Sequence, residues 1–83
     1  MSKSKPISYE NINKYTELGL NIAFYRKKKG YTQEQLAEKV GNSRSHLSAI
    51  EAPNIVKPFS IELLFDLAAA LQIDCYKLLE TRD

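Results

Sequence analysis

The chain has 83 residues, 43% of them hydrophobic and 27% charged, so we expect one globular domain with one core rather than a disordered chain. Its charges are segregated: residues 1–31 carry seven Lys or Arg against two Glu (net +5), whereas residues 60–83 carry two against five acids (net −3). One cysteine and one histidine exclude an intrachain disulfide and a His/Cys metal cluster. No apolar run is long enough to cross a bilayer or to form a signal peptide, so we expect a cytoplasmic protein without a membrane segment.

The first predicted element follows a short N-terminal segment. We expect residues 1–8 to form a flexible arm and residues 9–83 to form the folded domain. After the arm, apolar residues recur every three or four positions, at Ile12, Tyr15, Leu18, Ile22 and Tyr25. This spacing predicts a helix from about Tyr9 to Lys29. Its start is open, because either Ser8 or Thr16 could provide the N-cap.

That helix ends in four consecutive cations, Arg26 to Lys29, before Gly30. Cations are favoured at a helix C-terminus by about 0.3 to 1 kcal/mol each, but four in a row also repel one another. Nucleic-acid phosphates would relieve that repulsion. Lys27, Lys28 and Lys29 are therefore candidate contacts to a nucleic-acid backbone.

Residues 32–51 predict two short helices joined by a tight turn. Thr32 can cap the first helix, with Gln35 completing a capping box, and Gly41 follows its last apolar residue. Ser43 can cap the second helix, in which Leu47 and Ile50 face the same way. This arrangement predicts a helix-turn-helix whose second helix can enter a DNA major groove.

The face of the second helix opposite Leu47 and Ile50 is small and polar. It carries Ser45, Ser48, Ala49 and Ala52, with Arg44 and His46 on its flanks. Arg44 can donate two hydrogen bonds to a guanine edge, the serines can donate or accept, and the Ala49 methyl group can contact thymine. We therefore predict base contacts from Arg44, Ser45, Ser48 and Ala49.

The remaining chain predicts two further helices. Pro53 ends the second motif helix, Ser60 can cap a helix that runs to about Leu71, and Asp74 can cap a short last helix. Three apolar residues fall outside the core stripe of the helix after Ser60: Leu63, Phe65 and Ala69. Either residues 7–15 or a second copy of the chain would have to cover them.

A set of positions between Leu18 and Leu79 occurs in an order typical of one family. They are Leu18-Gly19, Ile22, Arg26, Gly30, Thr32-Gln33, Leu36-Ala37, Gly41, Ser43, Leu47-Ser48, Ile50-Glu51, Leu64, Leu67-Ala68, Ala70-Leu71 and Leu78. In this pattern the sequence resembles the lambda-repressor-like, Cro/cI-type (xenobiotic-response-element type) helix-turn-helix DNA-binding family. The resemblance implies an all-α fold, a compact five-helix domain with the helix-turn-helix at about 32–51. Asn42, where an apolar residue is usual, and a loop after Glu51 that is one residue longer depart from the family pattern.

The resemblance also implies roles for single residues. Arg26 and Glu51 would form a structural ion pair, and Gln33 would clamp the DNA backbone with its amide group pointing outward. Further backbone contacts are expected from residues around the second motif helix and in the loop after it: Ser43, His46, Asn54 and Lys57.

The predicted function is that of a sequence-specific transcriptional regulator of double-stranded DNA. We expect a repressor that binds a twofold-related operator as a homodimer. The alternative is a protein-interaction module on the same fold without DNA binding. No Gly-rich phosphate loop, Cys/His pair or acid pair indicates an enzyme, and we expect no cofactor, metal or small-molecule site.

Overall fold

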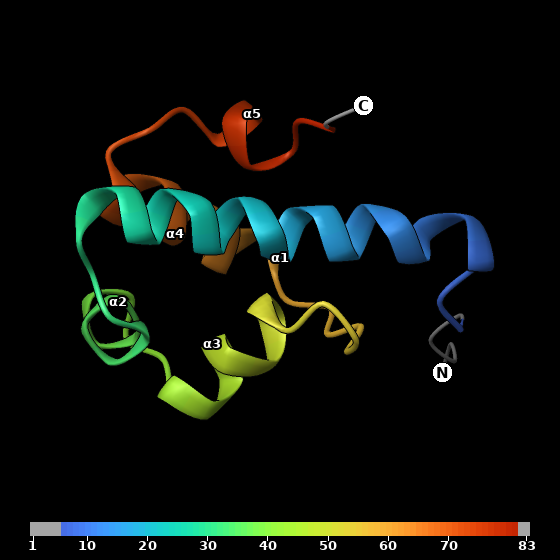
Figure 1. Ribbon diagram of the computed structural model, residues 1–83, viewed down its shortest axis with the longest axis horizontal. Helices are drawn as coiled ribbons and strands as arrows, with labels where there is room; N and C mark the ends of the chain where they lie inside the picture. The colour runs from blue at the N-terminus through green and yellow to red at the C-terminus, as the bar shows by residue number, and fades with distance from the viewer. Residues whose placement is uncertain (1–5, 82–83) are drawn as a thin grey trace.

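A 21-residue helix, α1 (Tyr9–Lys29), runs the length of the molecule (Figure 1). The computed structural model describes residues 6–81, so most of the predicted arm and the last two residues of the predicted domain lie outside the described residues. Four shorter helices follow α1, and residues 6–81 contain no strand: α2 (Gln33–Lys39), α3 (Arg44–Glu51), α4 (Ile61–Leu71) and α5 (Cys75–Leu78). The prediction of an all-α, five-helix fold is confirmed.

The start of α1, which the sequence left open, lies at the earlier of its two positions. Ser8 occupies the N-cap with extended backbone (φ −75°, ψ 150°), but its side chain makes no capping hydrogen bond. The first turns of α1 extend beyond the rest of the molecule (Figure 1), and Tyr9 is 87% exposed. This part of the helix therefore gains little from burial.

The core lies between α1 and the four shorter helices. Every helix contributes a buried apolar side chain, among them Ile22, Leu36, Leu47, Leu67, Leu71 and Leu78. Burial of each such side chain contributes about 1.5 to 3 kcal/mol. No described helix is both long and apolar enough to cross a membrane.

The helix α4 differs from its predicted pattern at one residue. Ser60 caps it as expected, with the Leu63 N–H donating to Ser60 Oγ at 3.1 Å. Leu63, which the sequence placed outside the core stripe, is nevertheless buried. Phe65 is 52% exposed and Ala69 is exposed, so the apolar excess on α4 is smaller than the sequence suggested.

A buried asparagine attaches the C-terminal part of the chain to α1. Asn21 Nδ2 donates to the carbonyl oxygens of Leu78 at 3.0 Å and Glu80 at 2.7 Å. The predicted cap at Asp74 has the expected extended backbone, but its side chain makes no capping hydrogen bond. The packing of Leu78 and the bonds from Asn21 therefore hold α5 in place, rather than its cap.

Candidate nucleic-acid interface

The N-terminus of α2 is closed by the capping box that the sequence predicts. The Gln35 N–H donates to Thr32 Oγ1 at 3.0 Å, and the Thr32 N–H donates to Gln35 Oε1 at 2.9 Å. Two backbone N–H donors at this end are thereby satisfied within the turn. The helix consequently begins at Gln33.

The turn between α2 and α3 depends on a glycine and an asparagine. Gly41 has a φ of 68°, a left-handed conformation that most residues avoid, and the chain reverses there. Asn42 Oδ1 accepts a hydrogen bond from the Ser43 N–H at 2.8 Å and lies 3.0 Å from His46 Nδ1. A hydrogen bond between the Asn42 side chain and the backbone therefore holds this turn, in which an apolar residue is usual.

The helix α3 separates its two faces as the sequence predicts. Ser43 caps it, because its Oγ accepts from the His46 N–H at 3.1 Å. Leu47 and Ile50 are 1% and 5% exposed and face the core, whereas Arg44 and Ser45 are exposed and Ser48 and Ala49 half-buried. The polar face of α3 therefore lies outside the core.

The size of α3 suits a DNA groove. An α-helix with its side chains is about 10 to 12 Å across, and the B-DNA major groove is about 12 Å wide. Small residues on the outer face, such as Ser45 and Ala49, leave the helix backbone free to approach base edges. Arg44 is the long exposed side chain at the N-terminal end of α3, the end from which helix-turn-helix proteins contact bases.

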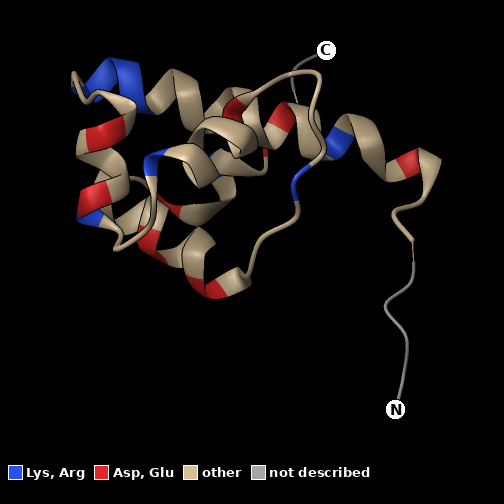
Figure 2. Ribbon diagram, turned by 90° about the horizontal axis from the view of Figure 1, so that it is seen from below, with Lys and Arg blue, Asp and Glu red and all other residues tan. Residues whose placement is uncertain are grey.

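The cations at the end of α1 do not all lie beside the outer face of α3. Figure 2 shows the Lys and Arg residues clustered at the C-terminal end of α1. Gly19 and Arg26 mark the side of α1 that faces α3, and Lys28 lies about 200° around the helix from Arg26. Lys28 and Lys29 instead line a cleft with Lys77, and Lys29 Nζ donates to Gln72 Oε1. The structure therefore does not bring Lys28 and Lys29 together with Arg44.

The other predicted backbone residues border α3. Ser43 is exposed at its first turn, and His46 is half-buried beside Asn42. Asn54 and Lys57 are exposed in the loop between α3 and α4. These residues begin α3 or follow it along the chain.

A buried ion pair holds α1, α2 and α3 together. Arg26 Nε and Nη2 donate to the two carboxylate oxygens of Glu51 at 2.8 and 3.0 Å, and their side chains are 10% and 4% exposed. Arg26 Nη1 also donates to the Tyr31 carbonyl oxygen at 2.8 Å, just before α2. The bidentate geometry is the strongest form of this contact.

The Gln33 side chain lies differently from the sequence-based expectation. Its Nε2 donates to Glu51 Oε1 at 3.0 Å, so the amide nitrogen is turned toward α3 rather than outward. The sequence carries no signal for this bond, because the two residues are 18 positions apart on different helices. Gln33 is therefore part of the buried ion-pair network.

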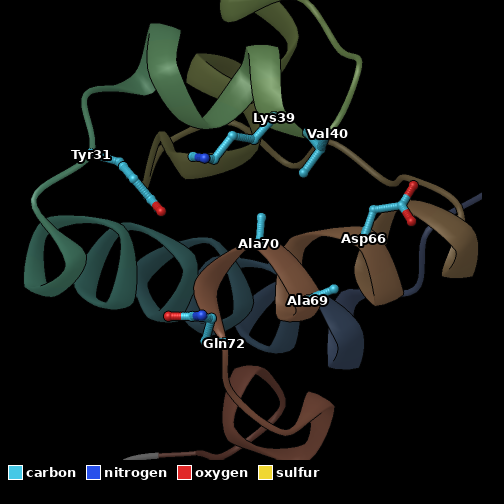
Figure 3. Close-up of a pocket in the computed structure, with 7 residues that line it drawn as sticks. All are labelled: Tyr31, Lys39, Val40, Asp66, Ala69, Ala70 and Gln72. Carbon is cyan, nitrogen blue, oxygen red and sulfur yellow. The ribbon is translucent and has the colours of Figure 1, made fainter.

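A cleft of about 580 Å³ lies between α2 and α4 (Figure 3). Lys39 Nζ lies 5.2 Å from the centre of the Tyr31 ring at one end, and Asp66 stands at the other end. Ala69 and Ala70 lie between them, so no polar groups converge on a common point. None of the predicted base contacts lines this cleft.

Known proteins share both this sequence pattern and this arrangement of helices. A helix-turn-helix family model matches residues 22–78, from the middle of α1 to the end of α5. The HTH-type transcriptional regulator SinR of Bacillus licheniformis is 41% identical over 66 residues, which cover 80% of this chain. The match spans 59% of the length of that regulator.

Solved structures show the same likeness. The N-terminal DNA-binding domain of SinR from Bacillus subtilis matches with a TM-score of 0.72 and 39% identity, covering 81% of this chain and 96% of that one. A crystal structure of SinR in complex with DNA matches with a TM-score of 0.69 and 41% identity, covering 76% of this chain and 98% of that one. The chain belongs to the helix-turn-helix family, as its resemblance to Cro/cI-type domains indicated.

Proposed function

We propose that this protein is a sequence-specific DNA-binding transcriptional regulator that places α3 in the major groove. The observation that carries the proposal is the division of α3, with Leu47 and Ile50 in the core and Arg44 and Ser45 exposed. Its relatives support it, since SinR is described as a transcriptional regulator and has been solved in complex with DNA. Such a regulator would act in the cytoplasm as a repressor, by occupying its operator.

Base recognition would come from the outer face of α3. Arg44 would donate two hydrogen bonds to guanine, and the Ala49 methyl group would contact thymine. Ser45 is exposed and can reach a base edge, whereas the half-buried Ser48 can contact only atoms close to the helix surface. We expect Arg44 to contribute most of the discrimination between sequences.

Backbone contacts would flank this face. Ser43 and His46 lie at the N-terminal end of α3, and Asn54 and Lys57 follow its C-terminal end. The cations at the end of α1 would attract the duplex through long-range electrostatics; they are Lys27, Lys28 and Lys29. Direct phosphate contacts are not expected from Lys28 and Lys29, because these two line the cleft with Lys77. Contacts of this kind fix the orientation of the protein without reading sequence.

We expect two copies to bind together. A single domain of this size buries only about 600 to 1,000 Å² on DNA, which gives weak binding. A homodimer on half-sites one helical turn apart doubles the contact area and requires an operator with twofold symmetry. The operator would therefore read as an imperfect palindrome.

A second candidate function rests on α4. This helix has an exposed apolar stripe at four-residue spacing, made of Ile61, Phe65 and Ala69. The stripe is separate from the outer face of α3. A protein-interaction module using this stripe would form a complex that is unaffected by changes at Arg44. DNA binding by the isolated protein would distinguish the two functions.

The test is to select bound duplexes from a random DNA pool and then to titrate the enriched duplex at two salt concentrations. We expect one enriched sequence, and an affinity that falls as salt rises because cations on the protein displace counterions from phosphates. Absence of measurable binding to any duplex at low salt would contradict the proposed function.

A further inference from the structure

One hydrogen bond joins the first residue of α2 to the last residue of α3. Gln33 Nε2 lies 3.0 Å from Glu51 Oε1, and the Gln33 side chain is half-buried. Within residues 6–81, no other side-chain hydrogen bond connects these two helices. It is therefore a directional link across the helix-turn-helix, separate from the turn itself.

The acceptor in this bond is held in place. Both carboxylate oxygens of Glu51 accept from Arg26, at 2.8 and 3.0 Å, and the Glu51 side chain is 4% exposed. A carboxylate at a helix C-terminus is otherwise disfavoured by the helix dipole, so Glu51 depends on these donors. The amide of Gln33 is consequently bound to a fixed and charge-compensated point on α1 and α3.

Two other sets of contacts seat α3. The ion pair of Arg26 with Glu51 ties it to α1, and Leu47 and Ile50 attach it to the core through apolar packing, which is not directional. Hydrogen bonds to base edges do not tolerate small movements of α3, because they weaken steeply when distance or angle departs from the optimum. The accuracy of base reading by α3 therefore depends on the directional bonds at Glu51, and the bond from Gln33 is the one that fixes α3 relative to α2.

We propose that Gln33 is a positioning residue that determines specificity: through Glu51 it fixes how α3 sits in the groove, and it does not act as a phosphate clamp. This inference rests on the proposed DNA-binding function. The two roles have different signatures. Loss of a phosphate contact weakens binding to all sequences alike, whereas a shifted recognition helix changes the ranking of sequences.

The experiment measures affinities for the duplex enriched from a random pool and for its single-base-pair variants. Four proteins are compared: the natural sequence, Gln33→Met, Glu51→Gln and the double variant. Gln35→Met is the matched control, because it removes a hydrogen bond from the same end of α2 without touching Glu51. Arg44→Ala is measured alone and together with Glu51→Gln. If Arg44→Ala lowers affinity by the same factor in both backgrounds, the Glu51→Gln protein still docks α3 on the duplex.

We expect Gln33→Met to lower affinity for the enriched duplex at least about tenfold, the lower end of the effect of one hydrogen bond to a charged group, and to reorder the base-pair variants. In the Glu51→Gln background the same change should lower affinity less than about twofold, since the partner is already altered. Gln35→Met should leave the ranking unchanged. A uniform loss on all duplexes that is equal in both backgrounds would overturn the proposal and return Gln33 to the role of a phosphate clamp.

A measurement without DNA separates this inference from the proposed function, and it does not depend on Glu51→Gln remaining folded. In Gln33→Met, the backbone amide signals of residues 44–51 should shift in the NMR spectrum, whereas Gln35→Met should shift signals in α2 alone. Unchanged α3 signals in Gln33→Met would overturn the positioning role. If α3 does shift but the protein binds no duplex, the proposed function is the part that is wrong.

Discussion

Arg26 is the residue on which the greatest number of separate elements depends. Its guanidinium group contacts Glu51 at the end of α3 and the carbonyl oxygen of Tyr31 ahead of α2, while its backbone belongs to α1. Both partners of the ion pair are almost fully buried, so neither can be solvated if the other is removed. The pair is consequently more important as a constraint than as a source of net stability.

Replacement of Arg26 by Met should strongly destabilise the fold. It leaves the Glu51 carboxylate buried without its main partner, which costs about 3 to 5 kcal/mol. Urea unfolding followed by circular dichroism measures the change in the free energy of unfolding. Lys27→Met, at an exposed neighbouring position, is the control and should change that free energy by less than about 0.5 kcal/mol.

Helix caps could be predicted from the sequence, whereas a hydrogen bond between helices could not. Thr32 and Ser43 were predicted to cap α2 and α3, and both do, because capping depends on residues only three positions apart. The bond from Gln33 to Glu51 was not predicted, because the contact exists only after the two helices have packed. Asp74 shows the reverse case, a correct capping position whose side-chain hydrogen bond does not form.

Among the elements, α1 and α3 approach each other closely at Gly19. A Cβ atom added at Gly19 would lie 2.2 Å from the Ile50 carbonyl oxygen, a distance that only a movement of backbone could relieve. Glycine is therefore required inside α1 despite its low helix propensity, because it lets α3 approach the α1 backbone.

The change Gly19→Ala should lower the free energy of unfolding by about 2 kcal/mol. Overpacking strain of about 3 kcal/mol outweighs the roughly 1 kcal/mol that alanine gains in helix propensity. Thermal and urea unfolding would measure the loss. Asn13→Ala, at an exposed position of the same helix, provides the control, and an equally stable Gly19→Ala protein would mean that α3 does not pack as closely as described.

The elements themselves were largely predictable, but the faces of α4 were not. Hydrophobic spacing gave the position of each helix, since three or four apolar residues per two turns suffice to define a buried stripe. Leu63 falls outside the stripe formed by Leu64 and Leu67 and was expected to need a cover, and it is buried. The width of the buried apolar stripe on α4 depends on which other helices pack against it. The spacing of apolar residues along α4 does not reveal those neighbours.

At the scale of the molecule, cations gather at the C-terminal end of α1 (Figure 2). The chain from residue 60 onward carries two Lys or Arg against five acids. A duplex would be attracted to the basic end, while α3 supplies the contacts that distinguish sequences. The sequence predicted both features, and the structure adds that Lys28 and Lys29 line a cleft with Lys77.

The proposed homodimer gives a prediction about the operator. Duplexes enriched from a random pool should contain two inverted half-sites whose centres are about 34 Å, or one helical turn, apart. Analytical ultracentrifugation of the protein with such a duplex should show two protein chains for each DNA molecule. A single half-site with one bound chain would contradict the twofold arrangement.

The most direct test of the central claim, that the outer face of α3 reads DNA, is a titration of the enriched duplex and its base-pair variants with the natural protein and with Arg44→Ala. We expect the substitution to weaken binding to the enriched duplex by about 1 to 3 kcal/mol and to abolish the preference at one base pair, because Arg44 is the exposed side chain placed to contact a guanine edge. Unchanged affinity and unchanged base preference in Arg44→Ala would contradict the claim.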